Sequence, residues 1–233
     1  MPFVEHLREL RRRLMISLWA FALGAILGYV LYHGYMAWLL RPFNEPLYVT
    51  ELTSAFMMRL RISFYAGFIL SLPVHLYNIV AFIVPALSPR ERRILGFFVA
   101  GSLVLTGTAI AIGYYQILPL SIRFLVSPEL RPDGVETMLR FQDAVSFVVQ
   151  LMFAFVLLFQ LPLLMLVLMA CGVVTRRFFL KFGRYFIIVI FILAAIFSPP
   201  DWISQIGLAL PLTCFYYLAI LIAKIAGFGN ADD

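Results

Sequence analysis

Charged side chains are scarce in this chain of 233 residues, where Asp, Glu, Lys and Arg together make up 13%. A soluble domain carries about 25% charged residues, so the composition argues against a water-soluble fold. With only two cysteines, the chain does not fit a disulfide-stapled secreted module. It also lacks the H-E-x-x-H, G-x-S-x-G and G-x-x-x-x-G-K-[ST] motifs, which weakens an interpretation as an enzyme that uses zinc, a serine nucleophile or a nucleotide.

Apolar residues make up 63% of the chain, and the mean hydropathy is +0.97. Disorder requires low hydrophobicity and is therefore excluded. A membrane-spanning helix needs about 20 mostly apolar residues, and the solidly apolar run at 186–197 does not alternate as a β-barrel strand would. We predict an all-α integral membrane protein, a single transmembrane domain over residues 1–233. The expected spans are residues 14–40, 62–87, 94–122, 144–175, 185–200 and 202–223.

The last two spans are separated only by Asp201, beside the helix-breaking pair at 199–200. This arrangement predicts a tight hairpin between two short helices. The fifth run holds 16 residues, about 24 Å of helix at 1.5 Å per residue. Because the hydrocarbon core is about 30 Å thick, we expect local thinning of the bilayer there.

The distribution of basic residues predicts the orientation. Twelve of the 18 Lys and Arg residues lie just before the first, third and fifth spans or just after the sixth, which is one side of the membrane. The other six lie in the segments on the opposite side. By the positive-inside rule both termini are expected in the cytoplasm. We interpret the net charge of +6 as this topology signal and expect no nucleic-acid partner.

The segment before the first span has two different helical faces. Leu7, Leu10 and Leu14 share one face, whereas His6, Glu9 and Arg13 share another. We therefore expect an amphipathic lead-in that lies at the membrane surface.

Two acidic residues, Glu9 and Glu91, lie among the basic residues of the predicted cytoplasmic side. Spacing alone favours local roles for both. Glu9 can pair with Arg12 or Arg13 along one helix, and Glu91 fits a capping box begun by Ser88. The alternative is that the two carboxylates together bind a cationic ligand that docks from the cytoplasm.

Polar residues within the spans are few, and none of the six spans contains Asp or Glu. That absence weighs against a proton-relay pump or a cation-coupled carrier. Gln160 is the polar side chain deepest within a span, and we expect it either to form a helix-to-helix hydrogen bond or to have a functional role. Gly24 and Gly28 form a GxxxG pair, which favours close helix packing and is a weak signal for dimerisation.

Five ordered blocks of sequence resemble the TatC family, the receptor subunit of the twin-arginine protein translocase. The similarity is collinear from about residue 3 to residue 224, nearly the whole chain. The blocks are HLRELRRRL at 6–14, FIVPALSPRERR at 82–93, LPLSIRFL at 118–125, FQLPLL at 159–164 and SPPDWISQ at 198–205.

The resemblance implies a cup-shaped bundle of six spans with both termini inside, in the bacterial inner membrane. It implies that Glu9 and Glu91 receive the paired arginines of a signal peptide, with Arg11, Arg13 and Phe82 in matching motif positions. A carboxylate accepts two parallel N–H bonds from one guanidinium, and lysine cannot reproduce that fork.

The implied partners are twin-arginine signal peptides of folded cargo proteins, single-span TatA and TatB subunits near the last two spans, and membrane lipids, in an oligomeric complex. The resemblance implies no cofactor, because the proton-motive force supplies the energy.

The chain departs from the family at two polar positions. Gln160 stands where the family usually has Glu, and Tyr217 aligns where Glu is frequent, whereas Asp201 matches. We expect Gln160, Tyr217 and Asp201 to mark intramembrane polar or partner contacts, although Gln cannot supply a negative charge.

Two other functions are weighed against the receptor. A small-solute carrier or channel subunit predicts polar residues along several spans and usually internal repeats, and the sequence shows neither. An intramembrane enzyme is disfavoured by the missing motifs.

Overall fold

The computed structural model describes residues 3–43, 45–51, 53–83, 89–130, 132, 138–198 and 200–229. Over these residues the chain is helical and forms no named strand, in agreement with the predicted fold class. One isolated bridge joins Tyr48 to Arg140. Six helical segments are long and apolar enough to cross a membrane. The helices are α1 Phe3–Val30, α2 Tyr32–Leu40, α3 Ser54–Ile83, α4 Pro89–Ile112, α5 Leu118–Leu125, α6 Phe141–Leu158, α7 Gln160–Ala170, α8 Arg176–Phe197 and α9 Trp202–Ala226.

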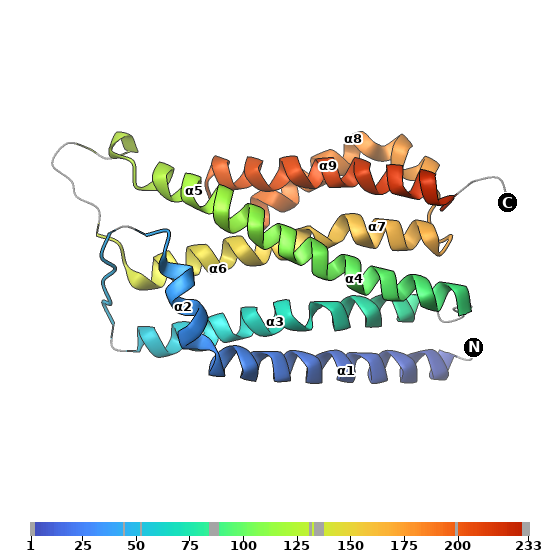
Figure 1. Cartoon of the computed structure of the whole chain (residues 1–233), viewed down its shortest axis with the longest axis horizontal. Helices are drawn as coiled ribbons and strands as arrows, with labels where there is room; N and C mark the ends of the chain where they lie inside the picture. Colours follow the sequence, from blue (N-terminus) through green and yellow to red (C-terminus); the bar gives the residue numbers. More distant parts are fainter. Residues whose placement is uncertain are drawn as a thin grey trace.

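The first span is shorter at its far end than the sequence predicts, because α1 stops at Val30 and α2 turns away from its axis (Figure 1). Side chains bind the carbonyl groups that this break exposes. Tyr35 donates to the carbonyl of Gly28 at 2.8 Å, and Arg59 donates to that of Tyr29 at 3.1 Å. The predicted surface lead-in is also wrong, since residues from Phe3 onward continue in line with the span as one helix.

The fifth span is longer than predicted. Helix α8 holds 22 residues, because the basic residues from Arg176 to Arg184 are helical and the side chain of Thr175 accepts from the amide of Phe178. It is about 33 Å long at 1.5 Å per residue, but its first nine residues include four basic side chains, so local thinning around the apolar part stays a prediction. At 22 and 25 residues, α8 and α9 are still the shortest of the six candidate spans.

Two spans contain an interruption that a proline explains. A single π-helical turn, Gly113–Ile117, joins α4 to α5 just before Pro119, where the missing N–H disrupts the regular ladder. Similarly, α6 and α7 meet at Phe159, three residues before Pro162. The combined α6–α7 span is the most buried of the six and forms the centre of the core.

Small residues let α1 and α3 pack closely. A Cβ atom on Gly24 would lie 2.7 Å from the carbonyl oxygen of Gly67, and one on Gly67 would lie 2.5 Å from the amide nitrogen of Ala25. A Cβ atom on Gly28 would lie 3.0 Å from that of Ala66. The glycine pair of α1 is thus used inside the chain, and this contact explains it without a dimer.

The start of α1 and the end of α9 lie at one end of the bundle, together with the start of α4 and the connection from α7 to α8 (Figure 1). The described loops before α3 and before α6 lie at the opposite end. We call these the terminal end and the loop end.

Candidate functional site

The first turns of α1 contact the last turn of α3 at the terminal end. The rings of His6 and Phe82 are stacked, with centroids 4.4 Å apart and planes inclined by 24°. One turn further along α1, Glu9 lies on the same helical face as His6, as the spacing predicts. His6, Glu9, Arg13 and Phe82 are all half-buried, whereas the leucines of the other face are exposed where lipid would surround the bundle.

Glu9 forms an ion pair with Arg13 along α1. Nη2 and Nε of Arg13 donate to the same oxygen, Oε1 of Glu9, at 2.6 and 3.1 Å. The side chain of Glu9 is 28% exposed and that of Arg13 is 21% exposed. This is the local i,i+4 pair that spacing favoured, and it leaves Oε2 of Glu9 without a partner among the described residues.

The remaining predicted residues of this site are placed less fully. Arg11 is exposed on α1 and does not join the Glu9–Arg13 pair. Glu91 is in the first turn of α4, which begins at Pro89 as predicted. The side chain of Glu91 and the whole of Ser88 lie outside the described residues. A carboxylate in a first turn is stabilised by the helix dipole, so the placement of Glu91 suits an anionic group.

Gln160 makes the helix-to-helix bond that the sequence suggested. Its side-chain amide donates to the hydroxyl of Thr106 in α4 at 3.2 Å and to the carbonyl of Val156 at 3.3 Å. The side chain is buried, and its Oε1 atom has no partner among the described residues.

Asp201 and Tyr217 do not join Gln160 in a common site. Asp201 is buried as the N-cap of α9, where its Oδ1 accepts from the amide of Ser204 at 2.7 Å. Tyr217 is half exposed on the surface of α9, beside Gly183 of α8. The two residues are 16 positions apart on one helix, about 24 Å along its axis.

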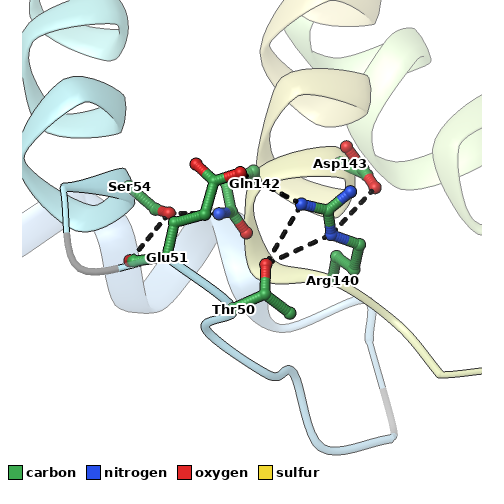
Figure 2. Close-up of polar contacts among 6 residues, drawn as sticks. All are labelled: Thr50, Glu51, Ser54, Arg140, Gln142 and Asp143. Carbon is green, nitrogen blue, oxygen red and sulfur yellow. Dashed lines mark hydrogen bonds and ion pairs between the residues drawn. The ribbon is translucent and has the colours of Figure 1, made fainter.

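A polar cluster at the loop end escaped the sequence analysis (Figure 2). Arg140 donates to the hydroxyl of Thr50 at 3.1 and 3.2 Å, and it lies 3.6 Å from Glu51 and 3.9 Å from Asp143. Gln142 donates to Ser54. The cluster joins the loop before α3 to the start of α6, and these were the two longest stretches between predicted spans, so their mix of charges was the available signal.

The geometry can be compared with known proteins. The profile of the family described as "Sec-independent protein translocase protein (TatC)" matches residues 5–211. The chain belongs to the TatC family.

Relatives and solved structures agree over nearly the whole length. The TatC protein of Aquifex aeolicus (strain VF5) is 33% identical, with 97% of this chain and 96% of that protein covered. TatCy of Bacillus subtilis (strain 168) is 30% identical, with 97% and 90% covered. A crystal structure described as the twin arginine translocase receptor TatC in DDM matches with a TM-score of 0.81 at 32% identity, covering 93% of this chain and 98% of that chain.

Membership of the TatC family confirms the resemblance drawn from the five sequence blocks. It identifies the chain as a multi-pass component of a protein translocase. This role points away from catalysis and towards binding and transport. At the terminal end, the structure selects Arg13 over Arg12 as the partner of Glu9, one of the two pairs that spacing allowed.

Proposed function

We propose that this TatC protein is the receptor that captures twin-arginine signal peptides at its terminal end, in the cytoplasm. It then serves as a scaffold for single-span TatA- and TatB-type subunits in the bacterial inner membrane. Glu9 and Glu91 each bind one arginine of the peptide, and Phe82 stacks on His6 to fix the floor of the site. Arg11 is exposed on α1, two residues and about 200° of helical turn from Glu9.

The observation that carries this proposal is the state of the Glu9 carboxylate. Both contacts from Arg13 go to Oε1, so the pair is not the two-oxygen fork that guanidinium and carboxylate form at their best. An i,i+4 pair of this partly exposed kind contributes only about 0.3–0.5 kcal/mol. An incoming arginine that reaches both carboxylate oxygens would complete the fork, so it can displace Arg13 or share Glu9 with it through Oε2.

In this proposal Arg13 positions Glu9 in the empty receptor. The pair keeps the carboxylate oriented along α1 and compensates its charge until a signal peptide arrives. Lysine in the peptide would offer a single ammonium without the planar fork, which explains a requirement for arginine.

The test is photocrosslinking of a signal peptide to the protein in membranes, comparing an Arg-Arg peptide with a Lys-Lys version. We expect Glu9→Gln to weaken labelling by the Arg-Arg peptide about tenfold or more, the equivalent of losing about 1.4 kcal/mol or more. Glu5→Gln is the matched control, because Glu5 is an exposed acid on the same helix, and labelling should stay unchanged.

Arg13→Gln separates capture from local pairing. It removes the internal competitor, so labelling by the Arg-Arg peptide should be kept or increased. Equal labelling by both peptides, or normal labelling of the Glu9→Gln and Glu91→Gln variants, would show that the two acids have only local structural roles.

A further inference from the structure

A cavity of about 260 Å³ lies beneath the corner between α1 and α2. Its walls are apolar and aromatic, and they include Tyr35 and Trp38 of α2 and Ala66 of α3. Leu31 and Leu70 also line it and are each 53% exposed, so the cavity opens to the outside of the bundle. Leu70 lies near the middle of the candidate span Ser54–Phe82, where a membrane helix faces hydrocarbon.

Arg59 lies at the head of the same stripe of α3. Arg59, Ile62 and Ala66 are spaced i, i+3 and i+7, which places them on one helical face, and the latter two line the cavity. Arg59 is five residues from the start of α3 at Ser54, about 8 Å along the helix. It is therefore nearer the loop end than the cavity is.

The guanidinium of Arg59 is held by aromatic rings and one carbonyl. Its Cζ atom lies 4.0 Å from the ring centre of Tyr29 and 5.1 Å from that of Tyr32, and Nη2 donates to the carbonyl of Tyr29. Nε is buried without a hydrogen-bond partner in the described part of the chain. The three ion pairs seen there involve other residues, so no described acid compensates this charge.

Arg59 lies near the loop end of its span and is half-buried, and its buried Nε and uncompensated charge favour an anionic partner. We propose that the cavity binds one acyl chain of an anionic phospholipid, whose phosphate pairs with Arg59. The phosphate supplies the missing negative charge, and the chain occupies the apolar space below it. A partner helix is about 10–12 Å across, so a space of about 260 Å³ suits a single hydrocarbon chain better.

Trp38 lines the cavity, so its fluorescence reports what enters. The experiment uses full-length protein with Trp19→Phe and Trp202→Phe, since both tryptophans are largely exposed. It is reconstituted in vesicles that contain phosphatidylglycerol or phosphatidylcholine with brominated acyl chains, which quench nearby tryptophan. We expect brominated phosphatidylglycerol to bind beside Trp38 with an apparent affinity, measured by the quenching of its fluorescence, at least threefold higher than that of brominated phosphatidylcholine.

Arg59→Gln should reduce this lipid preference to about one, whereas Arg123→Gln, which removes an exposed arginine at the loop end, should leave it unchanged. A protein that keeps only Trp202 should show no preference. If Arg59→Gln fails to fold, the comparison of the two lipids in the Arg59 protein still decides. Equal quenching by both lipids would overturn the proposal, and so would quenching by neither, because no acyl chain would then lie beside Trp38.

Discussion

Most buried polar side chains in this bundle form hydrogen bonds with other groups of the same chain. The hydroxyls of Ser121 and Ser204 lie 2.8 Å apart, and the side chain of Asn78 donates to Ser17 at 3.0 Å. Asp201 follows the same rule, since its first oxygen caps α9. This contact gives Asp201 a local role, but its second oxygen is buried without a partner among the described residues, so the partner contact expected from the family resemblance stays a prediction.

Substitution of Asp201 distinguishes the local role from a partner contact. Asp201→Ala removes an N-cap and should destabilise the protein by about 0.5–2 kcal/mol, whereas Asp201→Asn keeps an equally good cap. Thermal unfolding in detergent should therefore show a lower midpoint for Asp201→Ala and a nearly unchanged one for Asp201→Asn. A stable Asp201→Asn protein that no longer copurified with single-span partners would instead indicate that the negative charge serves the interface.

Single residues near Arg59 also show how local chemistry fixes the corner of α1 and α2. The hydroxyl of Tyr35 donates to the carbonyl of Gly28, and Arg59 donates to the carbonyl of Tyr29, the next residue of α1. A stable corner is what makes the cavity beside it persistent.

At the scale of helices, the sequence predicts the number and kind of elements but not all their ends. Runs between charges located six spans, because the interior of a bilayer excludes charge. They failed at Arg176, where basic residues belong to α8, and at Val30, where α1 breaks within an apolar run. Hydropathy cannot detect a break whose carbonyls are bound by residues such as Arg59 from another helix.

In the candidate site, too, local features could be predicted from the sequence and contacts between helices could not. The face shared by His6, Glu9 and Arg13 was predictable from helical spacing, and so was the pair of Glu9 with Arg13. The stacking of His6 on Phe82 needs α3 to end beside the first turn of α1, which no local pattern encodes. The cluster around Arg140 likewise depends on two loops about 90 residues apart.

The close contact of α1 with α3 predicts a strong asymmetry between glycines. Gly67→Ala would place a Cβ atom 2.5 Å from the backbone nitrogen of Ala25, and overpacking of this kind costs about 1–3 kcal/mol. Gly107→Ala is the control, since a Cβ atom there meets nothing within 4 Å, and alanine favours a helix by about 0.5–1 kcal/mol.

Thermal unfolding in detergent should therefore show a lower midpoint for Gly67→Ala and an unchanged or higher one for Gly107→Ala. A Gly67→Ala protein as stable as the unaltered one would mean that α1 and α3 can separate without loss. Their contact would then not hold Glu9 and Phe82 in register.

For the whole molecule, charge and fold together predict orientation. The structure gathers the starts of α1, α4 and α8 and the end of α9 at one end, and twelve of the 18 basic residues lie in the segments there. An excess of Lys and Arg in short loops marks the cytoplasmic side. The proposed capture of signal peptides requires the same orientation, because cargo reaches its receptor from the cytoplasm.

Cysteine labelling in intact cells tests this orientation. In a Cys171→Ser, Cys214→Ser background, Thr53→Cys at the loop end should react with a membrane-impermeant maleimide. Arg177→Cys at the terminal end should react only after the cells are permeabilised, and both positions are exposed in the structure. The reverse pattern would place Glu9 outside the cell, where no signal peptide awaits export, and the receptor mechanism would fail even if every helix were correct.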